Sequence, residues 1–245
     1  MERNLTRFVA LAGALVTDVR CIVEVGARDC RETLGFAQAF PRARIYALEC
    51  NPDTLPLCRA AVAGEPRITL IEKAAAERPG RLKFYPVDPA TNPGASSLYR
   101  ASGKFELEEY RQREVEVDAT TLESVVATEA SIDLLWMDIQ GAELSALKGL
   151  GARLADVGLI HLEAEFEEIY ASQPLFADVR AFLEANQFAF LGFTIYARHS
   201  ADAVFANRRR FGAGQIVAAL ARNPLLIRKR LQYVRHQLKR RLGLK

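Results

Sequence analysis

Two acidic side chains in apolar segments have a spacing that suits a nucleoside ligand. Glu24 lies in the segment CIVEV, which turns at Gly26 into a polar loop. Glu49 ends the segment RIYALE, 23 positions after Gly26, a separation at which a carboxylate can accept hydrogen bonds from both ribose hydroxyls. Each residue alone has a simpler explanation, because Glu24 could pair with an arginine and Glu49 could be a solvated strand end. Together they predict a nucleoside site.

The loop after Gly26 indicates what kind of nucleoside. A dinucleotide site usually reads G-x-G-x-x-G, with a pyrophosphate held against the start of a helix. This loop reads G-A-R-D-C-R, and its Asp29 would repel phosphate. We therefore expect a ligand without pyrophosphate and with a cationic group, which Glu24 or Asp29 could pair. S-adenosylmethionine, a nucleoside with an amino-acid head group, fits these features better than NAD.

A third acidic position, Asp138, ends the apolar segment IDLLWM. A hydroxyl that accepts a methyl group must lose its proton, and a carboxylate that faces it can act as the general base. Asp138 is our candidate base, and the alternative is that it caps the helix expected at DIQGAEL. Glu163 and Glu165 end another apolar segment, where they could be the base, orient the substrate, or be solvated strand ends.

Three further polar residues are candidate contacts to the substrate. They are Gln140, close to Asp138, and the pair Ser96 and Ser97, which could also be ordinary turn residues. His161 lies inside an apolar segment and is expected to be a satisfied core histidine. The four cysteines have no C-x-x-C pairing and no histidine at zinc spacing, so we expect no metal site and reduced thiols.

Strand and helix patterns alternate along the chain, which predicts a doubly wound, mostly parallel α/β sheet covered on both faces. The predicted strands are Cys21–Val25, Arg44–Glu49, Ile68–Glu72, Ile132–Asp138, Val157–Glu163, Phe188–Phe193 and Ala203–Ala206. The predicted helices include Glu32–Phe40, Pro52–Ala63, Ala142–Leu150 and Phe176–Asn186. Residues 80–117, rich in Pro, Gly, Ser and Asn, predict a short strand and a long loop. Ligands of such sheets bind beyond the carboxyl ends of the strands, where the acidic residues lie.

We divide the chain into a leading helix over residues 1–20, a central domain over 21–207 and a tail over 208–245. Half of the residues are hydrophobic and 26% are charged, an ordinary balance for a soluble protein with a sizeable core. No apolar run approaches the roughly 20 residues of a membrane span. The run from Phe8 to Val16 leads directly into the first strand, which favours a helix over a signal peptide. We therefore expect a cytoplasmic protein.

The tail is strongly basic. From Ala203 onward there are twelve Lys or Arg residues and no Asp or Glu, whereas the rest of the chain has 21 basic and 30 acidic residues. Asn223 and Pro224 predict a helix start. Apolar residues then recur on one face: Ile227, Leu231, Val234, Leu238 and Leu242.

Such a helix has three candidate partners. It could lie on the inner membrane surface, bind nucleic acid through phosphates, or pack against the acidic body or a second subunit. Nucleic acid is less favoured, because no aromatic stacking pattern accompanies the charge. The sequence gives no indication of the oligomeric state.

The chain resembles the FkbM-type S-adenosylmethionine-dependent methyltransferases over about residues 20–207. The resemblance lies in VEVGARDC, ALECNP, IEKAAAE, GASSLY, VDATTLESVV, LIHLEAEFEEIYASQPLF and above all IDLLWMDIQGAELSALKGLGARL. It implies a class I methyltransferase (Rossmann-like) fold whose last strand is antiparallel, and O-methylation of a hydroxyl on a glycan or secondary metabolite. By position it implies that Glu24, Gly26, Ala27, Arg28 and Asp29 hold the methionine end, that Glu49, Cys50 and Asn51 lie at the ribose, and that Ala74 and Ala75 lie near adenine.

Two departures from the family pattern stand out. The family loop commonly reads G-A-N-x-G, and Arg28 and Cys30 replace its Asn and second Gly. The fourth strand commonly carries Lys-Ile-Asp-Val-Glu-Gly, and Trp136 and Gln140 replace its Lys and Glu. Two alternative functions also stay open. One is a nucleic-acid methyltransferase that uses the basic tail, and the other is a cofactor-binding scaffold without catalysis.

Overall fold

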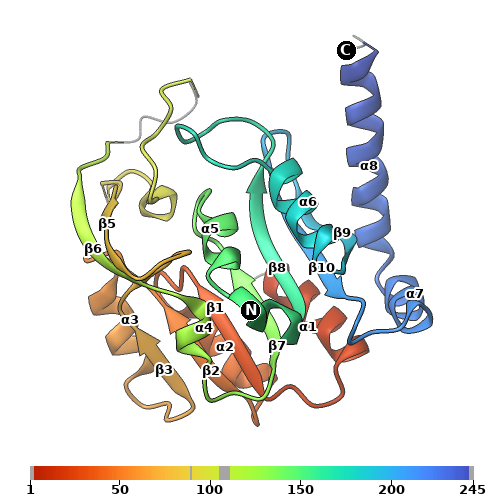
Figure 1. Ribbon diagram of the computed structural model, residues 1–245, viewed down its shortest axis with the longest axis horizontal. Coiled ribbons are helices and arrows are strands. Elements are labelled where there is room, and N and C mark those ends of the chain that lie inside the picture. Colours follow the sequence, from red (N-terminus) through yellow and green to blue (C-terminus); the bar gives the residue numbers. More distant parts are fainter. Residues whose placement is uncertain (1–2, 89, 105–110, 243–245) are drawn as a thin grey trace.

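The protein folds around one seven-stranded sheet in the order β3-β2-β1-β7-β8-β10-β9 (Figure 1). The computed structural model describes residues 3–88, 90–104 and 111–242; the outer ends of the predicted leading helix and tail, residues 1–2 and 243–245, lie outside these ranges. The strands are β1 (Cys21–Val25), β2 (Arg44–Leu48), β3 (Ile68–Ile71), β7 (Ile132–Met137), β8 (Val157–Glu165), β9 (Phe188–Tyr196) and β10 (Ser200–Asn207). All seven were predicted, with boundaries that differ by three residues or fewer.

Six strands run in the same direction, and β10 runs antiparallel to both of its neighbours, β8 and β9. β1 and β7 lie at the centre and are buried at every residue, as their continuous apolar sequences predict. This is the class I methyltransferase arrangement, with an antiparallel last strand. The carboxyl ends of β1, β2 and β7 therefore meet along one edge of the sheet, where the acidic residues were expected.

Helices cover both faces of the sheet (Figure 1). One core contains side chains of α4 (Leu122–Val125), α5 (Glu143–Lys148) and α6 (Phe176–Ala185), and α8 (Pro224–Arg241) adds Tyr233. The other core contains side chains of α1 (Arg3–Leu15), α2 (Arg31–Ala39), α3 (Leu55–Val62) and α7 (Ala213–Arg222). The helices expected at the leading segment and in the tail are both present.

A second, three-stranded sheet was not predicted. It has the order β4-β6-β5, with β4 (Ala74–Ala75), β5 (Gly80–Phe84) and β6 (Val115–Thr120). β5 is the short strand expected after residue 80, but β6 turns the end of the expected loop into ordered structure. A small core of its own, which includes Phe84, Val117 and Ala119, holds this sheet beside the carboxyl ends of β2 and β3.

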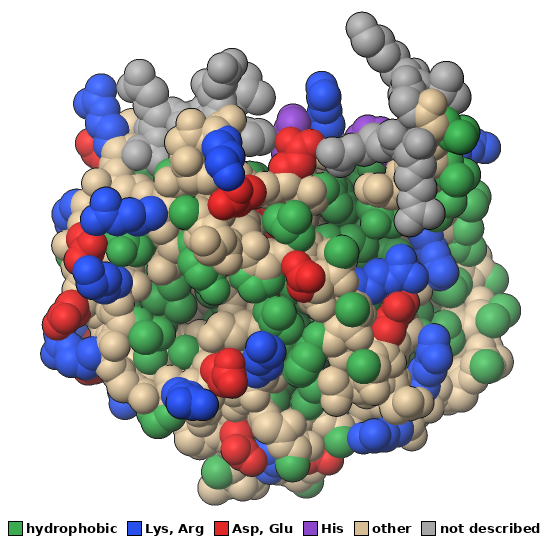
Figure 2. Space-filling view, turned by 45° about the horizontal axis from the view of Figure 1, so that its top comes forward, with side chains coloured by type: hydrophobic (Ala, Val, Ile, Leu, Met, Phe, Trp, Pro, Cys, Tyr) green, Lys and Arg blue, Asp and Glu red, His purple; other side chains and the backbone are tan. Residues whose placement is uncertain are grey.

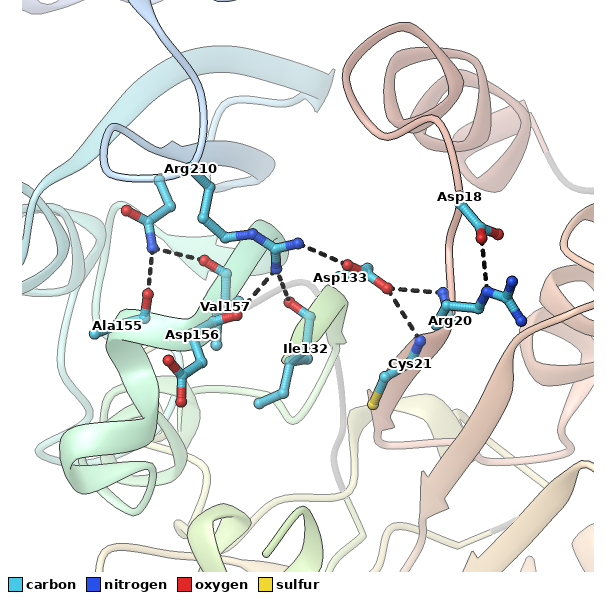
Figure 3. A network of polar contacts seen from close by, with 10 residues as sticks. Asp18, Arg20, Cys21, Ile132, Asp133, Ala155, Asp156, Val157 and Arg210 are labelled. Carbon is cyan, nitrogen blue, oxygen red and sulfur yellow. Dashed lines mark hydrogen bonds and ion pairs between the residues drawn. The ribbon is translucent and has the colours of Figure 1, made fainter. Parts of the chain in front are cut away.

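The opposite, amino edge of the main sheet is held by a buried ion pair (Figure 3). Asp133, at the start of β7, accepts a 2.8 Å hydrogen bond from Arg210, and its other oxygen accepts from the backbone N–H groups of Arg20 and Cys21. Arg210 also donates to the carbonyl oxygens of Ile132 and Asp156, both at 3.0 Å. This network joins β1, β7, β8 and the turn after β10, so it fixes the sheet at the end away from the candidate site.

Candidate functional site

A cavity opens at the carboxyl edge of the sheet, beside the second sheet. Its empty space is about 990 Å³ with the open mouth included, a volume that suits a nucleoside-sized ligand. The walls come from the residues that follow β1, β2 and β7, from β4, and from the loop 94–98. Figure 2 shows hydrophobic side chains exposed across the middle of the face that contains this edge, with most Lys and Arg side chains toward its margins.

Glu49 is the best-fixed polar group on this wall. Its side chain is buried, and its two oxygens accept hydrogen bonds from the backbone N–H groups of Arg28 (2.7 Å), Cys50 (2.8 Å) and Asn51 (2.7 Å). Burial raises the pKa of Glu49 above its ordinary value, while these N–H groups oppose the rise. The carboxylate thus faces the cavity in a fixed orientation, able to accept further hydrogen bonds from a ligand. Cys50 and Asn51 line the cavity beside it, as does Arg28.

The wall next to Glu49 is apolar, and we call this part of the lining the apolar slot. Ala74 and Ala75 of β4 are buried, and Phe84 of β5 and Leu98 of the neighbouring loop complete it. The small side chains of Ala74 and Ala75 leave room here for a planar ring such as a nucleobase. Ser96 also lines the cavity and contacts Asn51, whereas Ser97 is buried behind the wall and donates a 2.7 Å hydrogen bond to the carbonyl oxygen of Gln140.

Gly26 lines the cavity, and the close approach of two strand ends requires a glycine there. Its φ of +88° confirms the sharp turn. A Cβ at this position would lie 2.0 Å from the backbone oxygen of Asp138, so the backbone that approaches closely is that of the β7 end rather than a ligand. Glycine here lets the ends of β1 and β7 lie side by side.

The loop after Gly26 contains two strained residues. Arg28 (φ +50°) and Cys30 (φ +59°) both adopt the left-handed conformation. These are the positions where the resembled family commonly has Asn and Gly, the residues that tolerate this conformation best. The departures in sequence therefore leave the loop conformation in place, at some cost in backbone strain.

Three residues predicted at the methionine end lie outside the cavity lining. Glu24 is fully buried under α2, where Thr33 donates a 2.5 Å hydrogen bond to it, and burial raises its pKa well above the ordinary value. Ala27 is buried as well, and Asp29 pairs with Arg31 at the surface. On the same side of the cavity the lining contains Glu32 and Asn4, which the sequence did not single out.

Asp138 lines the cavity, and its side chain is fixed by Gln140. The Gln140 amide nitrogen donates to Asp138 at 2.8 Å and also to Glu163, while its oxygen accepts from the Tyr170 hydroxyl at 2.8 Å. Helix α5 begins later, with Ala142 at its N-cap, so Asp138 does not cap it. The amide of Gln140 thereby joins two carboxylates of neighbouring strands.

Glu163, Glu165 and Asp202 form an acidic row next to Asp138, in which Glu165 is buried and the other two side chains are half-buried. Burial and the neighbouring carboxylates raise the pKa of Glu163 well above its ordinary value, and they raise those of Glu165 and Asp202 to about 7. Asp202 lies opposite Glu163 on β10 and accepts a 2.9 Å hydrogen bond from Asn4. Asp202 and Asn4 were missed because only long-range strand pairing and helix packing bring them to this edge.

His161 is a core histidine. Its ring stacks on Trp136 at 3.7 Å between centroids, its Nε2 lies 3.0 Å from the Thr194 hydroxyl, and burial lowers its pKa to about 3. Trp136 also lines the cavity, so the stack forms its floor. Within residues 3–88, 90–104 and 111–242, no group of three or more His, Cys, Asp or Glu side chains has an arrangement that could hold a metal ion.

Residues 24–190 match the methyltransferase FkbM domain, a range that contains every residue of the cavity lining except Asn4. The chain belongs to the FkbM methyltransferase family. It is 29% identical over 163 residues to the 2-O-methyltransferase NoeI of Sinorhizobium fredii, a match that covers 62% of this chain and 66% of that protein.

Among solved structures, the bifunctional kinase-methyltransferase WbdD is similar, with a TM-score of 0.50 and 15% identity over 84% of this chain and 39% of that one. The structure of M. capricolum TrmK in complex with S-adenosylhomocysteine has a TM-score of 0.46 and 11% identity over 82% of this chain and 68% of that one. At these identities the likeness concerns the fold. The FkbM family assignment establishes a methyltransferase with a Rossmann-like sheet.

Proposed function

We propose that this protein is an S-adenosylmethionine-dependent O-methyltransferase. The observation that carries the proposal is the cavity at the carboxyl edge, where a fixed carboxylate, Glu49, lies between an apolar slot and the acidic end of β7. The FkbM family assignment supports the methyl-transfer chemistry, and the similarity to a protein named a 2-O-methyltransferase supports a hydroxyl acceptor.

The residues of the cavity suit this cofactor. Glu49 would accept hydrogen bonds from the ribose hydroxyls, with Cys50 and Asn51 beside it, and Ala74 and Ala75 would flank the adenine. The charged lining holds three acids, Glu32, Glu49 and Asp138, and two bases, Arg28 and Lys73, which favours a cationic ligand over a pyrophosphate. The bound cofactor would supply an activated methyl group on a sulfonium.

The protein's own contribution is to position the acceptor and remove its proton. Aligning two reactants can lower a barrier by roughly 7–11 kcal/mol, and a general base adds a rate factor of about 10²–10⁴. Asp138 is the proposed base because it lines the cavity and Gln140 fixes its orientation. Glu163 is the alternative, but it lies behind the lining, and a carboxyl group with a raised pKa keeps its proton to higher pH. Gln140, Glu165, Ser96 and Ser97 are proposed as residues that shape the acceptor site.

The acceptor class we propose is a hydroxyl of a glycan or secondary metabolite. Carboxylates accept hydrogen bonds from hydroxyl groups well, and Asp138, Glu163 and Asp202 lie at or just after three adjacent strands at this rim. Among the described residues, this rim has no comparable group of Lys and Arg side chains that could bind the phosphates of a nucleic acid. This favours a polyhydroxylated acceptor over a nucleic acid.

Calorimetric titration with S-adenosylhomocysteine tests cofactor binding, and heat saturating at micromolar ligand is expected. No heat at millimolar ligand would contradict the proposal. Transfer of a labelled methyl group to a panel of mono- and oligosaccharides then tests the enzyme activity. Binding without transfer to any hydroxylated acceptor would instead favour a scaffold without catalysis.

A further inference from the structure

Helix α8 presents an apolar stripe to solvent. We define the α8 stripe as five residues with exposed fractions of 40, 53, 43, 51 and 69%: Ile227, Leu231, Val234, Leu238 and Leu242. Among the described residues nine large hydrophobic side chains are exposed, and the α8 stripe and Val217 of the adjoining α7 account for six of them. Along the right-hand margin of Figure 2, hydrophobic side chains lie at the surface with Lys and Arg beside them. Isolated exposed leucines are ordinary, but a continuous stripe indicates an interaction surface.

The helix is held to the body by a different side. Tyr233 packs its ring among Phe166, Phe176 and Phe193, at centroid distances of 5.4, 5.6 and 5.4 Å. Leu226 is 4% exposed, and Arg230 donates a hydrogen bond to the carbonyl oxygen of Phe190. These contacts account for the position of α8 without the stripe. In the structure, therefore, the stripe does not pack against the acidic body of the protein.

The residues beside the stripe are cationic. At 100° per residue, Arg228, Arg235 and Lys239 follow the stripe along one flank, and all three are exposed. Within the described part of the chain no acidic partner is recorded for Arg228 or Arg235, and no Asp or Glu occurs after Asp202. The stripe is thus an apolar surface with a positive border.

We propose that the α8 stripe and its cationic flank dock on an anionic lipid surface. A lipid interface satisfies both halves of this surface, because acyl chains take up the apolar side chains while anionic headgroups attract the Arg and Lys side chains. A second copy of the chain would bring two positive flanks together, which is unfavourable. Nucleic acid would neutralise the charges but leave the stripe exposed to water. The inference is independent of the proposed methyl transfer.

Co-sedimentation with vesicles tests this docking on the full chain. One set of vesicles contains phosphatidylcholine alone, and the other contains phosphatidylcholine mixed with phosphatidylglycerol. The wild type should pellet with the anionic vesicles, pellet much less with the neutral ones, and be released at about 0.5 M NaCl, where charges are screened beyond a few ångströms. The double variant Leu231→Glu with Leu238→Glu should bind at least about tenfold more weakly, because it places charge in the apolar stripe.

Two controls make the result specific to the stripe. Leu57→Glu changes a leucine of α3 with a similar exposed fraction, 57%, and should pellet like the wild type. Arg228→Gln with Arg235→Gln keeps the stripe, and should lose the preference for anionic over neutral vesicles. Circular dichroism confirms that each variant retains its helices, as expected for exposed positions where Glu and Gln are good helix formers.

Three results would overturn the inference. They are equal pelleting of the wild type and the Leu231→Glu, Leu238→Glu variant, wild-type protein that stays in solution with anionic vesicles, and loss of pelleting in Leu57→Glu as well. Light scattering of the protein without vesicles tests for a fourth result that would overturn the inference. A wild-type dimer that becomes a monomer in the stripe variant would make the stripe a subunit interface instead of a lipid surface.

Discussion

The carboxylate of Glu49 shows how backbone geometry can fix the orientation of a proposed ligand contact. Three backbone N–H groups hold its two oxygens before any ligand arrives, so little ordering is needed on binding. The sequence places Glu49 at a strand end, but it does not reveal the three N–H donors, which depend on how the loop over residues 26–30 and the turn directly after Glu49 fold. The sequence predicts that Glu49 lies at this edge, but it does not predict the fixed orientation of its carboxylate.

Glu49→Gln should weaken the affinity for S-adenosylhomocysteine about tenfold to a hundredfold, since the amide loses one accepting oxygen and its charge. Calorimetric titration measures the change. Glu72→Gln is the matched control, because Glu72 also follows a strand but pairs with Arg59 at the surface. Unchanged affinity in Glu49→Gln would show that the ribose lies elsewhere.

Asp138→Asn should lower methyl transfer to an identified acceptor by about 10²–10⁴-fold while leaving the affinity for S-adenosylhomocysteine close to that of the wild type. The reason is that the amide keeps the shape of the side chain but cannot accept the proton of the hydroxyl. Full turnover in Asp138→Asn would eliminate the base role. The same assay on Glu163→Gln then tests the alternative base.

The raised pKa of Glu165 predicts a pH dependence of stability. In the unfolded chain this carboxyl group loses its proton near its ordinary pKa, whereas in the folded protein it holds the proton to about pH 7. The folded state thus binds more protons between these values, and its free energy of unfolding falls as the pH rises through that window. The fall from this one group is about 3 kcal/mol.

Glu165→Gln should remove this part of the pH dependence, because the amide keeps the shape of the side chain and can still accept the hydrogen bond from Gln173. Urea denaturation at pH 5 and pH 8 measures the difference. The variant should be more stable than the wild type at pH 8 and similar at pH 5. Parallel pH profiles for the two proteins would contradict this account of Glu165 in the acidic row.

At the scale of elements, the strands with continuous apolar sequences were predictable and the second sheet was not. β1 and β7 are buried on both faces, so their composition alone identifies them. β4 has only two residues, and the alternation in β6 covers six residues after a long polar stretch, too short a signal to be distinguished from a loop. The apolar slot of the site lies in this part of the chain.

The buried ion pair between Asp133 and Arg210 gives a stability prediction for these elements. Arg210→Ala leaves Asp133 without its cation in the sheet, and the free energy of unfolding should fall by about 3–5 kcal/mol. Chemical denaturation measures the loss. Arg20→Ala, in the same region of Figure 3, removes an arginine side chain that is 59% exposed and pairs with Asp18; the expected loss is below about 1 kcal/mol. Equal losses in the two variants would refute the structural role of the buried pair.

At the scale of the whole molecule, the basic end of the chain is part of the folded unit. Five of its twelve Lys and Arg residues lie within α8 up to Lys239, and the helix completes the aromatic core through Tyr233. Sequence periodicity identified the apolar stripe but assigned no role to Tyr233. Periodicity alone does not show which face of a helix packs against the rest of the protein. The stripe, which looks like a core face in the sequence, turned out to be the exposed one.

Tyr233→Ala should therefore lower the free energy of unfolding by about 2–4 kcal/mol, since it removes a large ring from the contact with three phenylalanines. Leu231→Ala, two residues earlier on the exposed face, should change it by less than about 0.5 kcal/mol. Thermal or urea denaturation of the two variants measures the contrast. If Leu231→Ala were the more damaging change, the helix would be packed by its stripe.

The start of α8 also affects whether protein molecules associate through the edge of the sheet. β9 ends the seven-stranded sheet, with β10 as its one neighbour there, and Arg230 donates to the carbonyl oxygen of Phe190 within it. Gly192 (φ +144°) admits α8 so closely that a Cβ would lie 2.4 Å from the carbonyl oxygen of Leu226. An outermost strand without such cover is a template on which a neighbouring chain can add a strand and begin to aggregate. We therefore expect Gly192, because it admits this cover, to reduce aggregation of the protein at high concentration.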